Sequence, residues 1–575
     1  MKSLRRLLSS PWTWAVLAVF AMLAIKGWLT AGDRLPFNAD EAVVALMARH
    51  ILQGARPVFF YGQAYMGSLD AFLVAGAFAL LGQQVWAIRL MQTLLYLGVL
   101  LTSGWLGRAA FGSWKVGVLG MLLLAIPTVN VTLYTTASLG GYGEALLLGN
   151  LILLTGMRIG CCLRSNQHPG ALWRWALLGF WMGLGLWAFG LTLVYSLPAL
   201  VYLLVLIIRR PTTIAPLEAD APPMNSADSS PERLTTLATA FPLSNLIAPV
   251  LALGIGGLIG SAPWWGYALT NGFGKLLFEL GGGAIAGVEK LPWLLQAGRH
   301  IMGLGLLGTT VTMGMRPPWE VYWLGFLLLP LILMFWMAVI VFILRRLRRS
   351  HPNRADQALL VGVMLTLLLG FILTPFGADP SGRYFVPLAV PLSLYAGAMI
   401  LDLRKSYGVM SYGLVALLLV YHLWGTAQSA LRFPPGITTQ FYTPSQVDQR
   451  VLPSLMDFLR QHGESYGYTN YWVAYPLAFL SEEELIYLPS LPYHMDFRHT
   501  TRDDRYAPYR DRVAQAQRVA YITTKHPTLN DRLRQQFAAQ GLTWQEEQIG
   551  DFTVFYALST PLRPEQLELS QESNP

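Results

Sequence analysis

Apolar residues occur in this chain as long, almost uninterrupted runs rather than at the spacing of an amphipathic surface. A helix of about 20 apolar residues crosses the roughly 30 Å hydrocarbon core of a bilayer. Only 13% of the residues are charged, whereas a soluble domain carries about 25%. The sequence therefore predicts a polytopic α-helical membrane protein. It excludes an ordinary cytosolic enzyme, a disordered scaffold and a fibrous protein.

Arginine and lysine gather in short segments between the apolar runs, and such segments face the cytoplasm in most membrane proteins. A chain with a cytoplasmic N-terminus, a retained first helix and about eleven spans places every dense basic cluster inside, including RRLRR at 345–349. The net charge of +9 follows this distribution, so no nucleic-acid partner is expected. The expected spans are 11–31, 88–106, 117–133, 142–157, 173–189, 191–208, 244–268, 320–344, 357–374, 386–402 and 408–426.

The first outer loop, residues 32–87, contains two further apolar segments that we do not expect to cross. Ala42 to Gln53 has the pattern of a short amphipathic helix. Residues 68–82 are apolar but too short to span at 1.5 Å per residue, and they carry Asp70. Counting 68–82 as a span would place RRLRR outside, so an interfacial or re-entrant helix is expected there.

Two domains are expected: a transmembrane domain over 1–429 and a small extracytoplasmic α/β domain over 430–575. The first would include a cytoplasmic linker at 209–243 and an outer loop at 269–319. The second is polar and turn-rich. Its candidate helices and strands are Val447–His462, Thr528–Gln540, Val519–Thr523 and Phe552–Leu558. An aromatic-rich segment at 467–479 fits a glycan-binding surface, a lid or the core of this domain.

Ionisable residues collect where the expected spans end on the outer face of the cytoplasmic membrane. Asp40 and Glu41 follow the first span, Glu144 begins an inward helix, and Arg383 with Tyr384 lies in a short loop. Each has a local explanation: acids stabilise helix N-termini, and arginine and tyrosine anchor helices at the interface. Their shared placement on one face favours a common site.

The segment FNADEAVVALMARHILQGARPVFFYGQAYMGSL at 37–69 resembles bacterial family-39-like glycosyltransferases. With the later acid and the RYF segment, the match over residues 1–430 resembles the GT-C membrane glycosyltransferases, in the group of protein O-mannosyltransferases and lipid A aminoarabinose transferases. The resemblance implies a polyprenyl-monophosphate sugar donor used at the outer leaflet. Asp40 matches the catalytic acid and Glu41 its neighbour, Glu144 the second acid, and Arg383 with Tyr384 the late segment. Aminoarabinose transferases carry a Lys-Pro-Pro segment where this chain has YGQAYMGSL (61–69), without lysine.

Sugar transfer from a phosphate needs a base for the acceptor hydroxyl and a cation for the leaving phosphate. We assign the base to Asp40, with Glu144 orienting it or the acceptor, and expect inversion at the anomeric carbon. Arg383 is the candidate for the phosphate, with weaker candidates Lys275, Arg299 and His300 in the outer loop. No cofactor is expected, and no ligand spacing demands a divalent metal, although paired acids leave one open. The acceptor is a protein, lipid or polysaccharide.

Two other functions remain open. A transporter or flippase for a polyprenyl-linked lipid or another solute would place polar groups at mid-membrane, whereas these spans carry almost no charge. A non-catalytic receptor would use the 430–575 domain for binding and would not need Asp40 or Glu144.

Overall fold

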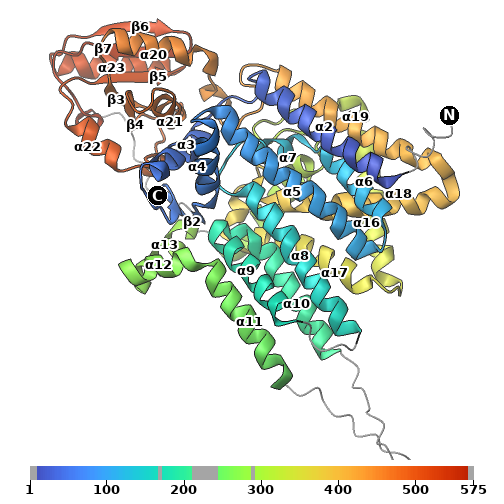
Figure 1. Ribbon diagram of the computed structural model, residues 1–575. Coiled ribbons are helices and arrows are strands. Elements are labelled where there is room, and N and C mark those ends of the chain that lie inside the picture. Colours follow the sequence, from blue (N-terminus) through green and yellow to red (C-terminus); the bar gives the residue numbers. More distant parts are fainter. Residues whose placement is uncertain (1–9, 166–170, 210–243, 286–291, 568–575) are drawn as a thin grey trace, which may run out of the picture.

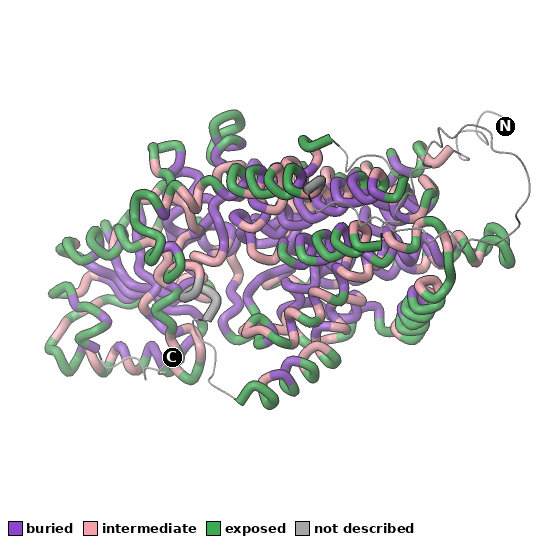
Figure 2. The backbone as a smooth tube through the Cα atoms, turned by 90° about the horizontal axis from the view of Figure 1, so that it is seen from below, coloured by how far each residue is buried: buried purple, intermediate pink, exposed green. Residues whose placement is uncertain are grey.

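The computed structural model describes residues 10–165, 171–209, 244–285 and 292–567. A helical bundle carries a small α/β domain at one end (Figure 1). The buried residues form a core that continues from the bundle into this domain (Figure 2). The helices of the bundle are α2 (Pro11–Ala31), α5 (Val85–Phe111), α6 (Trp114–Ala125), α7 (Val129–Tyr134), α8 (Tyr142–Arg164), α9 (Leu172–Ala188), α10 (Leu193–Ile208), α11 (Ser244–Gly260), α12 (Ala262–Asn271), α16 (Leu329–Arg348), α17 (Arg354–Leu373), α18 (Ala389–Tyr407) and α19 (Gly413–Leu431).

Seven helical stretches of the described residues are long and apolar enough to cross a membrane, or eight if the bent pair α11 and α12 forms one span. Every expected run is helical over most of its length. This number is smaller than the eleven expected spans for two reasons. Helices α6 and α9 have only 12 and 17 residues, and α18 and α19 belong to one stretch of 49 residues. Helix α6 ends at Ala125 because Ile126, which precedes Pro127, has left the helical conformation (φ −124°, ψ 76°). The number of eleven spans stays a prediction.

The first loop is not the surface structure that its pattern predicts. It contains α3 (Ala39–Leu52), the hairpin of β1 (Phe59–Phe60) and β2 (Gln63–Gly67), and α4 (Leu69–Leu81). The expected helix at 42–53 is present as α3, but α3 is buried on almost every side. It packs against α4 and against the C-terminal domain, which cover its polar as well as its apolar residues. Helix α4 has 13 residues and is too short to span, as expected for 68–82.

The expected outer loop at 269–319 is largely helical where it is described. It contains the end of α12, α13 (Phe273–Ile285), α14 (Trp293–Gly303), a π-helical turn η2 (Leu304–Gly308) and α15 (Thr309–Thr312). The expected linker at 209–243 lies outside the described residues apart from Arg209.

The C-terminal domain is the predicted α/β unit. Its five-stranded sheet has the order β4-β3-β5-β7-β6, with β3 parallel to β4 and β5, and β7 antiparallel to β5 and β6. Alternate residues of β5 face two cores: Ile522 joins the core under α20, and Tyr521 packs on Phe537 of α23. Both predicted strands and both predicted helices are present. The elements are α20 (Leu452–Gln461), β3 (Tyr466–Thr469), α21 (Tyr471–Leu480), β4 (Ile486–Pro489), α22 (Pro508–Ala514), β5 (Ala520–Thr524), α23 (Pro527–Ala539), β6 (Gln545–Ile549) and β7 (Phe552–Tyr556).

Polar contacts fix the C-terminal domain to the end of α3, beside which α21 lies in Figure 1. The Arg49 guanidinium donates to the Phe479 carbonyl at 3.0 Å, and His50 Nε2 lies 3.1 Å from a carboxylate oxygen of Glu483. The Tyr509 hydroxyl donates to the same oxygen at 2.8 Å. The domain is therefore held by specific contacts at the end of the bundle where the candidate site residues were expected.

Candidate functional site

Asp40 lies in the first turn of α3, where the free amides of the helix favour a carboxylate. Asn38 caps this helix by accepting from the Glu41 amide at 3.1 Å. The hydroxyl of Tyr471, the first residue of α21, donates to Asp40 Oδ1 at 2.6 Å. Burial and the Asp40 charge raise the pKa of Tyr471 well above its usual value, so this hydroxyl keeps its proton and stays a donor. The sequence thus brings together two helix N-termini that lie far apart in the chain.

Arg383 and Tyr384 begin the 3-10 helix η5 (Arg383–Leu388), across the site from α21. The Arg383 guanidinium is paired with Asp379 at 2.6 Å and lies 4.9 Å from the centre of the Tyr384 ring. The amide of Asn130 fixes this loop by donating to the Gly382 carbonyl at 2.9 Å. One tyrosine side chain, Tyr134, lies within electrostatic reach of Asp40, Asp379 and Arg383. Asp40 and Arg383, for which the sequence predicted a common site, therefore both lie near Tyr134.

The C-terminal domain adds a second arginine to the site. Arg505 lies within electrostatic reach of Asp40 and of Tyr65 on β2. Tyr65 also lies within electrostatic reach of Arg383, so one tyrosine is near both guanidinium groups. Close by, burial and the negative charge of Asp40 raise the pKa of Asp503 to about 7, although Arg505 opposes the shift.

An apolar cavity of about 430 Å³ begins at the tyrosines of this site. Tyr65 and Tyr384 line one part of it, and the rest is lined by apolar residues of α9, α10 and α17, together with Trp264 and Leu280. Phe376 stacks edge-on against Tyr384, with ring centres 5.3 Å apart. The site therefore combines a polar centre with an adjoining apolar cavity, which is the arrangement that an amphipathic lipid requires.

Glu41 points away from its neighbour in the motif. Its two carboxylate oxygens accept from Arg89 of α5 at 3.0 and 3.2 Å, and both side chains are buried. This bidentate pair ties α3 to α5 inside the core. The structure thus gives Glu41 a role in holding the helix that carries Asp40.

Glu144 lies in the first turn of α8 but faces another acid, Asp70 of α4. Asp70 accepts from Gln92 at 2.8 Å and from Ser138 at 2.7 Å. Among the described residues, the buried Glu144 side chain has no hydrogen-bond partner other than Asp70, and no described contact joins it to Asp40. The structure therefore places Glu144 in a separate pair of acids beside the site.

The helices that carry the outer-loop cations pack near the site, α13 against β2 and α14 against residues 375–378. Lys275 is exposed on α13 and Arg299 is exposed on α14. His300 is buried, and its Nδ1 lies 3.0 Å from the Ile372 carbonyl. None of the contacts described for Lys275 or His300 involves Asp40 or Arg383.

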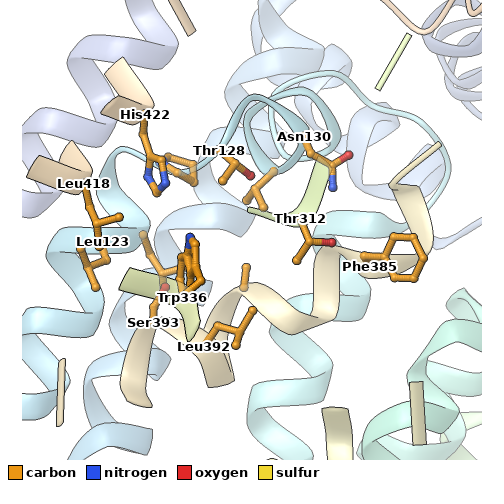
Figure 3. Close-up of a pocket in the computed structure, with 14 residues that line it drawn as sticks. Leu123, Thr128, Asn130, Thr312, Trp336, Phe385, Leu392, Ser393, Leu418 and His422 are labelled. Carbon is orange, nitrogen blue, oxygen red and sulfur yellow. The ribbon is translucent and has the colours of Figure 1, made fainter. Parts of the chain in front are cut away.

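Two other features bear on what the site can hold. A cavity beneath the Arg383 loop, lined by Asn130, Trp336 and His422 (Figure 3), has a volume of about 30 Å³. That volume has room for about one water molecule and excludes a sugar. Within the part of the chain that the structure describes, no group of three or more His, Cys, Asp or Glu side chains could hold a metal.

Several residues of the site were missed by sequence reasoning. Tyr134, Asp503 and Arg505 have no motif around them, and the last two belong to the C-terminal domain. Signals existed for Tyr65, which lies in the segment 37–69, and for Tyr471, which lies in the aromatic-rich segment 467–479. Val473 and Leu477 of that segment are core residues, and Tyr471 faces Asp40, while glycan binding and a lid stay predictions.

No protein-family model and no curated protein matches this sequence. Solved structures are similar to it. The apo structure of ArnT from Cupriavidus metallidurans is 13% identical, with a TM-score of 0.58 over 94% of this chain and 97% of that chain. The structure of the same protein bound to undecaprenyl phosphate is 11% identical, with a TM-score of 0.53 over 96% and 99%. The apo oligosaccharyltransferase of Archaeoglobus fulgidus is 11% identical, with a TM-score of 0.48 over 89% and 69%.

ArnT is a lipid A aminoarabinose transferase with the GT-C fold. The similarity covers nearly the full length of both chains, so this chain has the GT-C fold: a multi-pass helical membrane domain followed by a small α/β domain. The resemblance identified from residues 37–69 is confirmed at the level of the fold.

Proposed function

We propose that this GT-C-fold membrane protein is a glycosyltransferase that moves a sugar from a polyprenyl-monophosphate donor to an acceptor hydroxyl at the outer face of the cytoplasmic membrane. The observation that carries the proposal is the carboxylate of Asp40, held by Tyr471 near two arginines. ArnT, which shares the fold, binds undecaprenyl phosphate. A lipid phosphate and a base are what such a transfer requires.

Asp40 would act as the general base. Its carboxylate accepts the proton of the acceptor hydroxyl while the hydroxyl oxygen bonds to the anomeric carbon of the donor. The bond from that carbon to the phosphate oxygen breaks, and polyprenyl monophosphate leaves with the electron pair. This single displacement inverts the anomeric carbon. The hydrogen bond from Tyr471 orients the carboxylate but leaves its second oxygen, Oδ2, for the acceptor.

The leaving phosphate would lie against Arg383 and Tyr384, with the prenyl chain in the adjoining cavity of about 430 Å³. A guanidinium is suited to a phosphate because it donates two parallel hydrogen bonds. Asp379 holds Arg383 in place. No step of this proposed reaction requires a metal or a cofactor.

The test is sugar transfer by the purified protein in liposomes. Radiolabelled polyprenyl-phosphate sugars would be supplied with a membrane fraction as the source of acceptor. For Asp40→Asn, which keeps the volume but removes the base, we expect transfer to fall by about 10²- to 10⁴-fold. Asp33→Asn is the matched control, because Asp33 is an exposed acid of the same loop at φ 48°, which asparagine tolerates.

Equal transfer by the wild type and Asp40→Asn would remove Asp40 as the base. If no label leaves the lipid but the protein moves labelled lipid between leaflets, the transferase proposal fails and a transporter is the better description.

A further inference from the structure

We infer that Arg505 of the C-terminal domain is a donor-phosphate ligand, so that the C-terminal domain completes the site as well as covering it. The inference rests on the proposed function and assigns to that function a residue outside the membrane domain. It is carried by the position of Arg505, by the kinds of atoms around its guanidinium and by its distance from carboxylates.

The backbone at Arg505 is fixed by helix α21. The Arg505 amide donates to the Tyr475 hydroxyl, which donates in turn to the Asp503 carbonyl at 3.0 Å. Tyr475 lies one turn after Tyr471 on the same helix, and Tyr471 binds Asp40. Helix α21 therefore fixes both the Asp40 carboxylate and the backbone of Arg505.

The guanidinium of Arg505 is surrounded mainly by neutral groups. It lies 5.4 Å from the centre of the Tyr471 ring, and its Nη1 donates to the Gly62 carbonyl at 3.3 Å. The Gln63 side-chain oxygen, in the orientation that satisfies its hydrogen bonds, accepts from both terminal nitrogens at 3.0 and 2.9 Å. Nε is buried and has no partner among the described residues.

Two other arginines near the site are paired with carboxylates. Glu41 pairs with Arg89, and Asp379 pairs with Arg383. No described carboxylate lies within ion-pair distance of Arg505, although Asp40 and Asp503 lie within electrostatic reach. A partly desolvated guanidinium without a contacting carboxylate favours an incoming anion, because the anion restores the lost solvation and neutralises the charge.

The place of Arg505 identifies which anion this is. Gln63, which accepts from Arg505, also donates to the Tyr65 hydroxyl at 3.3 Å. Tyr65 lines the apolar cavity together with Tyr384, and the Arg383 guanidinium lies 4.9 Å from the centre of the Tyr384 ring. An anion between the two arginines would therefore have an apolar chain on one side and Asp40 on the other. That is the position of a lipid-linked phosphate whose sugar faces the base. A phosphate on a protein or polysaccharide acceptor would have no need of the adjoining apolar cavity.

The test measures binding of undecaprenyl monophosphate, with no sugar and no acceptor, to the full-length protein in detergent. For Arg505→Gln we expect the Kd to rise by about 10- to 100-fold, the range for a hydrogen bond to a charged group. Arg505→Lys is expected to recover part of the affinity, since it keeps the charge but not the paired donors. Arg502→Gln is the matched control, because Arg502 is an exposed arginine of the same segment.

Undecaprenol, which lacks the phosphate, shows whether Arg505 binds the phosphate or only maintains the structure of the site. We expect its Kd to be the same in the wild type and in Arg505→Gln. An equal loss of affinity for both lipids would overturn the inference, because it would show general damage to the site. An unchanged Kd for the phosphate, with a higher KM for the acceptor fraction, would overturn it too and assign Arg505 to the acceptor.

A second measurement needs no variant. Phenylglyoxal modifies accessible arginines, and the modified residues are identified by mass spectrometry. Undecaprenyl monophosphate is expected to protect Arg505 and undecaprenol is not; protection by neither would contradict the inference. Because both measurements use a lipid without a sugar, they remain decisive if the wild-type protein transfers no sugar and the proposed function fails.

Discussion

Asp503 offers a stability test whose magnitude follows from the structure. Its carboxyl is 7% exposed, and burial and the Asp40 charge raise its pKa from 3.8 to about 7. A group with a raised folded-state pKa favours the folded state below its unfolded pKa, and this contribution is lost as the pH rises through the folded pKa. At about 1.4 kcal/mol for each pKa unit, the difference between 3.8 and about 7 corresponds to about 4 kcal/mol lost between pH 4 and pH 8.

Asp503→Asn removes this titration, because asparagine has the size of the protonated acid and no charge. Relative to the wild type, the variant is therefore expected to gain up to about 4 kcal/mol of unfolding free energy between pH 4 and pH 8. The assay is unfolding of the detergent-solubilised protein at several pH values, followed by tryptophan fluorescence. Comparing two proteins at each pH cancels the titration of every group that they share.

Parallel wild-type and variant profiles from pH 4 to pH 8 would refute the reasoning, because they would mean that Asp503 titrates alike in the folded and unfolded states. Asp40→Asn supplies an internal check. Removing the Asp40 charge is expected to lower the pKa of Asp503, so the loss of stability with rising pH should be smaller in that variant than in the wild type.

Three further substitutions test other contacts. Glu41→Gln leaves Arg89 buried without its carboxylate and is expected to lower the unfolding free energy by about 3–5 kcal/mol; an unchanged thermal midpoint would contradict this. Tyr471→Phe removes the hydrogen bond to Asp40, and a hydrogen bond to a charged group contributes about 1.5–3 kcal/mol. We therefore expect kcat/KM for transfer to fall by about 10- to 100-fold. Unaltered kinetics would show that this hydrogen bond does not orient the base. Glu144→Gln removes the repulsion from the neighbouring acid, so we expect a thermal midpoint at or above that of the wild type; a clearly lower midpoint would mean that the charge of Glu144 is needed for folding.

The sequence determined the class of structure because its strongest signals are local. Long apolar runs form helices wherever backbone groups cannot reach water, and the short candidate strands in the turn-rich region 430–575 predict a sheet. The strands β5 and β7 and the helices α20 and α23 follow from such patterns. Asp40 and Arg383 were found because each stands at the end of an apolar run, where a polar residue is conspicuous.

The same local signals misjudged α3 and could not assign Glu41 or Glu144. An alternation of polar and apolar residues indicates a helix with two faces but not what covers the polar face. Here that face is covered by α21, and Glu41 meets an arginine 48 residues away in the chain. Glu144 likewise faces Asp70, a partner that no spacing in the sequence reveals.

What the sequence alone determined is therefore the membrane class, the position of most helices and two of the charged groups of the site. Only the tertiary structure decided that the C-terminal domain belongs to the site, since Tyr471 and Asp40 are 431 residues apart in the chain. The physical reason is that helix and strand formation depend on neighbouring residues, whereas a site depends on which side chains the packing of distant elements brings within a few ångströms of one another.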